Sequence, residues 1–287
     1  MKTLSTLCLF AVLFTVPNVL KAQDFSLGIS TGVSSYFGDL MYNNSLFNQS
    51  SPAFSVSGSY DFTDRFRSRL NLSFLTVKGD DAKSPDKGTH DRNLNFISNV
   101  IEASLLAEID IVDGTKNANA IYLFTGPGVF YYDPTTIDRY GNKVHLHDWG
   151  TEGQTNTKYN NLQQIAKKIA EKSQYHKTAL SFTAGVGVRH EITPIMSLGV
   201  EFAYRFTNTD YLDDVSNKDY ADPNLVTPYV WHLAYRGDEI NPKATSPGWQ
   251  PRGNPNKMDA FYTIQFRLSF KIGRDNNGLR SLSRYGY

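Results

Sequence analysis

Only one cysteine, Cys8, occurs in the 287 residues of this chain, and neither sign of charge is in excess. The 29 Lys and Arg residues nearly balance the 28 Asp and Glu residues, so the chain lacks the basic field that grips nucleic acid phosphates. Mean hydropathy is −0.40, and beyond the first residues no apolar run could span a bilayer as a helix, which excludes a helical membrane bundle. The remaining classes are a soluble β-rich protein and a membrane β-barrel, whose alternating strands give little hydropathy signal.

The first 23 residues have the pattern of a secretory signal peptide. Lys2 supplies a positive start, Leu7 to Leu20 are largely apolar, and cleavage is expected just after Gln23. A membrane anchor is the alternative, but the apolar stretch is short for spanning. Lipoprotein processing at Cys8 is rejected because the apolar region follows this residue. Removal of residues 1–23 would leave no thiol for disulfides, nucleophilic catalysis or metal binding, and an exported chain without disulfides favours a Gram-negative envelope.

Eight segments of the remaining chain alternate between apolar and polar residues. In the last of them, for example, Tyr262, Ile264 and Phe266 alternate with Thr263 and Gln265. The segments cover residues 25–34, 54–62, 69–76, 97–110, 121–131, 180–189, 197–207 and 262–272. Such alternation predicts strands with one apolar face, and most of these segments reach the roughly 9–11 residues that a tilted strand needs to cross a bilayer. We therefore predict an all-β fold: an eight-stranded antiparallel transmembrane β-barrel over residues 24–273. A soluble lipocalin-like barrel, with its apolar side chains inside, is the alternative.

The connections between these segments alternate in length. Long joins cover residues 37–51, 78–94, 132–177 and 208–258, and shorter ones cover 63–65, 112–119 and 192–194. This order predicts four long loops on one side of the barrel and both termini on the other side. In outer-membrane barrels the short turns are periplasmic and the long loops face outward. The predicted location is the outer membrane of a Gram-negative cell, with outer-membrane lipid around the barrel.

Charged residues recur on the face expected to point inward. They are Glu102, Glu108, Arg189, Glu201, Arg205, Arg267 and Lys271. An eight-stranded barrel has an interior that side chains can fill, and buried charges are costly unless paired. We interpret these residues as an internal salt-bridge network that plugs the lumen, with a proton or ion path as the alternative.

Five short motifs fall on the long-loop side of the predicted barrel. They are Tyr36 to Leu40, Asp91 to Phe96, Gly150 to Gln154, Thr209 to Ser216 and Arg252 to Pro255. With these motifs in this order, the chain resembles the PorG-like family of outer-membrane barrels from Bacteroidota, whose founding member belongs to the type IX secretion system. The resemblance runs from about Phe25 to about Ile272, and Thr-Asp-Tyr-Leu-Asp-Asp-Val-Ser is its most specific element. The motif residues expected to form an interaction surface are Gly38, Asp39, Arg92, Thr151, Glu152, Gly153, Asp210, Tyr211, Asp213, Asp214, Arg252 and Gly253.

The resemblance implies a non-enzymatic component or anchor of the secretion machinery. It also implies association, on the periplasmic side, with a PorK-like ring lipoprotein and a PorN-like periplasmic protein. It implies no cofactor and no catalytic residue. A free-standing structural or adhesive barrel is one alternative function. The tail, residues 274–287, is expected to be periplasmic and to contribute to partner binding, or to be a disordered end.

The long loops also contain a predicted helix and a group of carboxylates. Apolar residues recur at helical spacing in the third loop, at Leu162, Ile165, Ala166, Ile169 and Ala170, and predict a short amphipathic helix. This loop, Asn161 to Gln174, is longer than the family pattern suggests. The carboxylates Asp39, Glu152, Asp210, Asp213 and Asp214 could converge on a hard cation such as calcium, but no EF-hand spacing is present. We favour turn capping and ion pairing, with Arg92 bound to an acid, and predict no metal site.

The remaining class is a membrane-lipid enzyme with a site on the loops. His145 and His147 flank Leu146 beside Asp148, a spacing that can bind a metal on an extended segment. However, neither Gly-x-Ser-x-Gly nor His-Glu-x-x-His is present. The sequence therefore favours a protein without enzymatic activity.

Overall fold

The computed structural model describes residues 25–41, 49–112, 118–154, 174–224, 226–243, 247 and 251–272. Three predicted features lie outside these ranges: the signal peptide at 1–23, the apolar positions of the third-loop helix, and the tail at 274–287.

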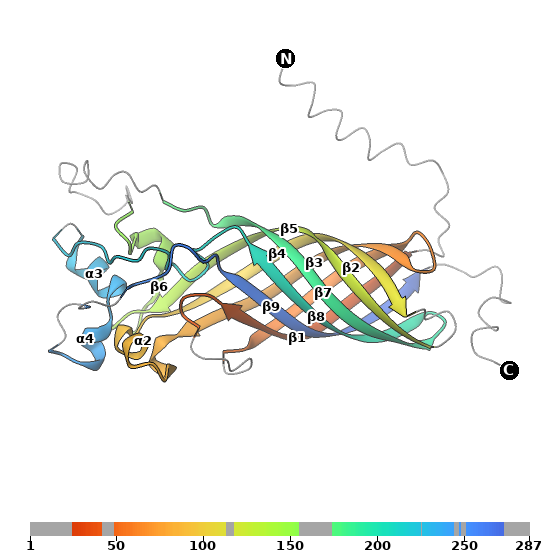
Figure 1. Cartoon of the computed structure of the whole chain (residues 1–287), viewed down its shortest axis with the longest axis horizontal. Coiled ribbons are helices and arrows are strands. Elements are labelled where there is room, and N and C mark those ends of the chain that lie inside the picture. The colour runs from red at the N-terminus through yellow and green to blue at the C-terminus, as the bar shows by residue number, and fades with distance from the viewer. Residues whose placement is uncertain are drawn as a thin grey trace, which may run out of the picture.

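Eight strands close into one antiparallel barrel (Figure 1). They are β1 (Phe25–Phe37), β2 (Ser51–Asp61), β3 (Phe66–Asp80), β4 (Asn95–Val112), β5 (Asn119–Ile137), β7 (Thr178–Thr193), β8 (Met196–Thr207) and β9 (Ala260–Ile272). Each strand pairs with its neighbour in sequence, and β1 closes the ring against β9 in a register that puts Phe25 opposite Ile272. The predicted eight-stranded barrel is confirmed, and each strand contains its predicted alternating segment apart from Phe62, which follows β2.

The outer wall of this barrel is apolar and the inner wall is largely polar. On β2 the exposed positions include Phe54 and Val56, and they alternate with the buried Ser55 and Ser57. The same alternation runs along β4, where Ile101 and the other isoleucines point outward. A soluble barrel would have the opposite arrangement, so the lipocalin-like alternative is wrong. The apolar outer wall requires a lipid environment, because water would leave a continuous belt of large side chains exposed.

The two ends of the barrel differ in the length of their connections. β2 and β3 are joined by residues 62–65, where Phe62 N–H donates to Phe66 O at 3.0 Å, and β7 and β8 are joined by residues 194–195. The strands begin with Phe25 and end with Ile272 at this same end, which we call the short-turn end. The long joins gather at the opposite end, the loop end (Figure 1).

Short elements that the sequence analysis did not predict occur in three of the long joins. They are η2 (Asp81–Lys83), α2 (Lys87–Arg92), β6 (Lys143–His145), η3 (Leu146–Trp149), α3 (Pro228–Ala234) and α4 (Gly237–Ile240). Strand β5 also continues to Ile137, six residues beyond its apolar run, because β6 pairs with its end. Each of α2 and α3 begins at a residue whose side chain accepts a backbone N–H, Asp86 and Thr227 respectively. No helix within the described ranges is long and apolar enough to cross a membrane.

The barrel interior changes character along its length. Towards the short-turn end it contains charged side chains, as the sequence predicted. Towards the loop end the buried side chains are apolar, and Phe96, Phe130 and Tyr132 are each at most 1% exposed. Rings pack against one another there, for example Phe130 against Phe261 with centroids 5.7 Å apart. We call these two parts of the interior the charged half and the apolar half. The apolar half was not predicted, because its residues interrupt an otherwise polar inward face.

Candidate functional site

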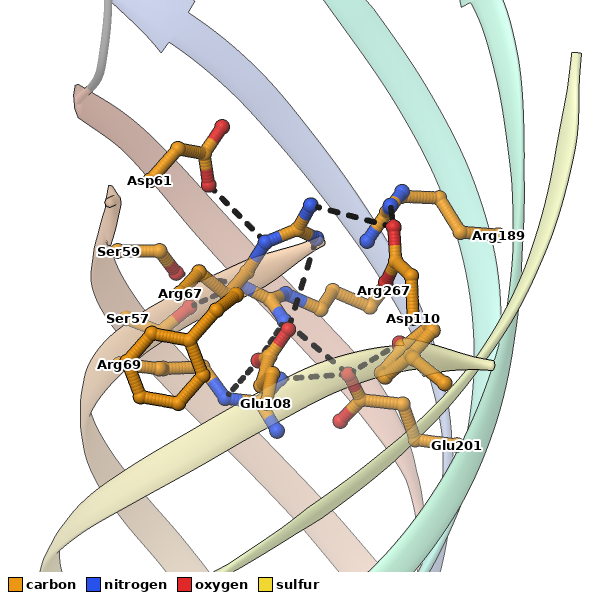
Figure 2. Close-up of polar contacts among 12 residues, drawn as sticks. Ser57, Ser59, Asp61, Arg67, Arg69, Glu108, Asp110, Arg189, Glu201 and Arg267 are labelled. Carbon is orange, nitrogen blue, oxygen red and sulfur yellow. Dashed lines mark hydrogen bonds and ion pairs between the residues drawn. The ribbon is translucent and has the colours of Figure 1, made fainter. Parts of the chain in front are cut away.

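The charged half of the lumen is an almost continuous set of ion pairs (Figure 2). Arg69 lies between two carboxylates, with Nε 2.8 Å from Glu108 Oε1 and Nη1 2.5 Å from Glu201 Oε1. Arg267 Nη1 contacts the same two oxygens at 3.1 Å each. The carboxylate of Glu201 also accepts a hydrogen bond from the hydroxyl of Tyr122 at 2.6 Å. This core of two acids and two arginines crosses the lumen from β3 to β9.

Further ion pairs lie on both sides of this core along the lumen. Towards the loop end, Arg205 Nε donates to Glu102 Oε2 at 3.2 Å, and Ser181 donates to Glu102 Oε1 at 2.6 Å. Towards the short-turn end, Arg189 donates to Asp110 at 2.7 Å. Every inward charge listed from the sequence therefore has an ionic partner. Arg189 joins the core through Asp110 and Arg67, whereas Glu102 with Arg205 and Lys271 with Glu191 form separate pairs. Arg69, which the sequence reasoning left out of the set, is as central as any of them, and its alternation with the outward Leu70 and Leu72 was the available signal.

At the loop end, Arg252 is the centre of contacts among three motifs. Its Nη1 donates to Glu152 Oε1 at 2.5 Å and to the Asp214 carbonyl at 3.0 Å, and its Nη2 donates to Thr151 Oγ1 at 3.0 Å. Thr151 in turn donates to the carboxylate of Asp214. Arg252 is 2% exposed, so this cluster is a buried structural connection rather than a surface.

Glu152 connects the loop after β5 to the loop after β8. Its Oε1 accepts the backbone N–H groups of Ser216 and Asn217, each at 2.9 Å. Asn217 also donates from its side-chain amide to Oε2. Gly153 closes the turn that presents Glu152, since its N–H donates to Gly150 O at 2.9 Å. With these hydrogen bonds and the one from Arg252, both oxygens of the Glu152 carboxylate have partners within the protein.

Arg92 makes the corresponding connection for the first two long loops. Its Nε and Nη2 hold Asp81 at 2.6 and 2.9 Å, and Nη2 also reaches the Asp39 carbonyl at 2.8 Å. Its Nη1 donates to the carbonyl of Arg252 and so joins the two arginine centres. The expected acid partner of Arg92 is therefore Asp81, which the sequence reasoning did not single out.

Asp39 fixes the segment before β9. Its Oδ2 accepts the Asn254 N–H at 2.7 Å. Gly253 lies against this carboxylate, and a Cβ there would stand only 2.7 Å from Asp39 Oδ2 and from Val215. The close approach of the two loops therefore requires glycine at this position. We call Asp39, Arg92, Thr151, Glu152, Asp214 and Arg252 the loop lock.

A second buried group lies beneath the loop lock. The Tyr36 hydroxyl lies 2.6 Å from Asp213 Oδ2 and 2.8 Å from Asp259 Oδ1. A phenol has one hydrogen, so one of these contacts requires a hydrogen from a protonated carboxyl group. Burial, together with their mutual repulsion and other nearby acids, raises the pKa of both Asp213 and Asp259 well above the ordinary value. Gly38 leaves room for this group, since a Cβ there would stand 2.0 Å from Asp259 Oδ1.

Two more motif acids have raised pKa values. Burial and the neighbouring acids Asp39 and Glu152 raise the pKa of Asp210 to about 7. Burial raises the pKa of Asp214 to about 6, against the opposing effect of Arg252. Tyr211 stacks on Tyr175, with centroids 4.5 Å apart and planes at 8°. These motif residues act on one another rather than facing solvent.

The two histidines considered for a metal site or an enzyme active site, His145 and His147, have different partners. Within the described ranges, no group of three or more His, Cys, Asp and Glu side chains has an arrangement that could hold a metal ion. His145 Nδ1 contacts Asp133 at 2.7 Å, whereas His147 Nε2 contacts the Tyr175 carbonyl at 2.9 Å. The two imidazoles therefore have different partners and do not converge on one point.

Comparison with solved structures gives weak likenesses to bacterial outer-membrane barrels. Neisserial surface protein A is 11% identical, with 86% of this chain and 97% of that chain covered at a TM-score of 0.37. Ail of Yersinia pestis is 10% identical, with 86% and 97% covered at 0.37. A major outer membrane protein from Thermus thermophilus is 10% identical, with 86% and 98% covered at 0.40. Likenesses at this level carry no argument about function.

Comparison with curated proteins found no match. A family model described as the outer membrane protein beta-barrel domain matches residues 6–229, which is more than half of the chain. The closed eight-stranded barrel and its apolar outer wall agree with this match. The chain belongs to the outer membrane protein beta-barrel domain family, and the outer membrane is its location.

Proposed function

We propose that this protein is a non-enzymatic anchor within the type IX secretion machinery. In this role the barrel holds a PorK-like ring lipoprotein and a PorN-like periplasmic protein at the membrane. The observation that carries the proposal is that both halves of the lumen are filled, by ion pairs in one and by an apolar core in the other. A filled barrel offers no channel, so its function must lie at its ends or on its outer wall.

The secretion role and the orientation rest on the motifs. In the PorG-like pattern the loop motifs face outward, and the short-turn end faces the periplasm. Most of the motif residues are buried in contacts with one another, so they support a rigid loop end rather than a binding surface there. The short-turn end is then the end available to periplasmic proteins.

The absence of enzymatic activity is part of the proposal. It is supported by the separate engagement of His145 and His147, each with its own partner. A lipid enzyme would need a nucleophile or metal beside one of these imidazoles. Replacing His145 and His147 by Gln is expected to leave lipid turnover in the membrane unchanged. A loss of turnover would favour the enzyme alternative instead.

The direct test is a pull-down of the tagged protein from outer membranes in mild detergent, followed by mass spectrometry. Stoichiometric recovery of a ring lipoprotein and its periplasmic partner is the expected result. Recovery of abundant, correctly inserted barrel without partners would overturn the secretion role and favour a free-standing structural or adhesive barrel. Deleting residues 274–287 in the same experiment tests whether the tail contributes to the partner contact.

A further inference from the structure

A small recess opens into the lumen at the short-turn end. It has a volume of about 40 Å³, which is room for roughly three water molecules. The turn between β7 and β8, residues 193–196, forms one wall. Inward residues of β1, β2, β3, β5, β7, β8 and β9 form the others. Its charged lining residues are Arg67, Arg189, Arg267, Lys271, Asp61 and Glu191.

The lining of this recess is more positive than the network behind it. Four of its charged residues are cations and two are acids. The carboxylates that balance these cations, Glu108, Asp110 and Glu201, do not line the recess. They contact the guanidinium groups from deeper in the barrel, for example Asp110 at 2.7 Å from Arg189 and Glu108 at 3.1 Å from Arg267. The wall that faces the opening is therefore cationic, and Figure 2 shows the arginines spread around these acids.

Three guanidinium nitrogens of the lining arginines are buried behind this wall and have no hydrogen-bond partner within the described part of the chain. They are Arg67 Nε, Arg189 Nη1 and Arg267 Nε, of which Arg67 Nε still lies 3.0 Å from Asp61 Oδ1. A buried N–H of this kind is costly when it is unpaired. The hydroxyls of Ser26, Ser197 and Ser269 line the same space and can donate as well. A group that carries only acceptors, such as a carboxylate, is what such a set of donors recognises.

We propose that the recess receives the side-chain carboxylate of an Asp or Glu residue from the periplasmic partner. This inference rests on the proposed function, because it needs the short-turn end to face the periplasm and a protein to dock there. The size of the recess matches a single carboxylate, and the charge of its lining matches an anion. Docking of one acidic side chain would place the partner over the mouth of the lumen and put a negative charge against the cationic lining.

The recess itself is tested by NMR on the purified full-length protein in detergent micelles. The probe is sodium acetate, and the signals are the guanidinium N–H groups of Arg189 and Arg267. A saturable shift of these signals with acetate, absent with sodium chloride at the same ionic strength, is expected. No shift, or the same shift with chloride, overturns the inference, because the recess then holds only water.

The partner contact is tested by pull-down with matched arginine variants. Arg189→Gln is expected to reduce recovery of the ring proteins by about tenfold or more. Arg65→Gln is the control, because Arg65 is an exposed arginine in the turn between β2 and β3 at the same end but outside the recess. Heat-dependent gel migration confirms that both variants form the barrel. Arg189→Lys, which keeps the charge, is expected to recover part of the capture.

The outcomes separate this inference from the proposed function. If wild type captures the ring proteins and Arg189→Gln captures them equally, the recess contact is overturned and the anchoring role stands. If wild type captures no ring protein, the anchoring role falls together with the partner contact. The acetate titration then decides alone whether the recess binds carboxylates at all.

Discussion

The charged half and the apolar half of the lumen are built on the same strands but filled by opposite chemistry. In the charged half Arg69, Arg267, Glu108 and Glu201 neutralise one another at 2.5 to 3.1 Å. In the apolar half Phe96, Phe130 and Tyr132 lie in one cluster of buried apolar side chains. Removing one ion from the first leaves another buried and unpaired, whereas removing a side chain from the second leaves a cavity. One barrel is therefore closed to solvent in two ways, and a substitution destabilises the charged half through an unpaired charge but the apolar half through a cavity.

The largest effect is expected from Glu201→Ala. This change leaves Arg69 and Arg267 without one of their two shared carboxylates, and breaking a buried ion pair costs roughly 3–5 kcal/mol. Equilibrium unfolding in guanidinium, in lipid vesicles, measures the change in the free energy of unfolding. Glu191→Gln is the control, because Glu191 is partly exposed and lies 3.7 Å from Lys271, so its loss should cost roughly 0–1 kcal/mol. Equal losses for the two variants would show that the charged half is not the buried network described above.

A slightly smaller effect is expected from Leu75→Ala in the apolar half. Leu75 is 4% exposed, and truncating a buried leucine costs roughly 2–5 kcal/mol through lost burial and the cavity left behind. Leu72→Ala, on the opposite face of β3 and 38% exposed, is the matched control with a smaller expected cost. The same unfolding experiment applies. A larger loss at Leu72 than at Leu75 would contradict the apolar half as a packed core.

The loop lock should respond to the shape of Arg252 as well as to its charge. Arg252→Lys keeps the positive charge but removes the fork that holds Glu152 and Thr151, at a cost of about 1–3 kcal/mol. Limited proteolysis at the loop end is expected to speed up while the barrel still resists heating in detergent. Arg139→Lys, at a partly exposed pair with Asp238, should change little. Unchanged proteolysis in Arg252→Lys would mean that the loop lock does not hold the loops.

The smallest effect concerns pH and the acids at the loop end. Asp210 and Asp214 have pKa values raised to about 7 and about 6, and Asp213 and Asp259 are also raised. A carboxyl group with a raised pKa in the folded state binds more protons there than in the unfolded chain. Its stabilising effect is full below about pH 4 and is lost as pH rises through the folded value. Proteolysis at the loop end should therefore be slower at pH 5 than at pH 8, after correction for protease activity on an unfolded substrate. Asp210→Asn should weaken this dependence, and an unaltered profile would exclude Asp210 as a contributor.

The two halves also differ in how far the sequence predicted them. The outer wall and the charged half follow from alternation, because every second residue on a strand faces the same side. Glu102, Glu108 and Glu201 could be placed inward for that reason alone. The apolar half could not, since Phe96 and Val100 are apolar residues on the otherwise mostly polar inward face of β4, and alternation alone does not predict them there.

The loop end was the least predictable part. Arg252 and Glu152 are far apart in sequence, and so are Tyr36 and Asp259, so only the folded loops bring them together. No local pattern marks Asp81 or Asp259, because each is one acid among several in a polar loop. The helices α2 and α3 are short, and their capping residues Asp86 and Thr227 give only a weak signal without a long apolar period.

The length of β5 sets how far the loop end stands above the membrane. Its outward residues from Ile121 to Tyr131 are apolar except for Thr125, and then Asp133 follows. A strand of 19 residues measures about 65 Å, and at a tilt of roughly 35–45° it rises by about 45–55 Å, against an apolar band of about 25 Å. Part of this additional height lies at the loop end, because the six residues of β5 beyond Tyr131 add about 20 Å of strand, or roughly 15 Å of height at that tilt. The end of β5, where β6 pairs with it, therefore stands about 15 Å beyond the lipid hydrocarbon.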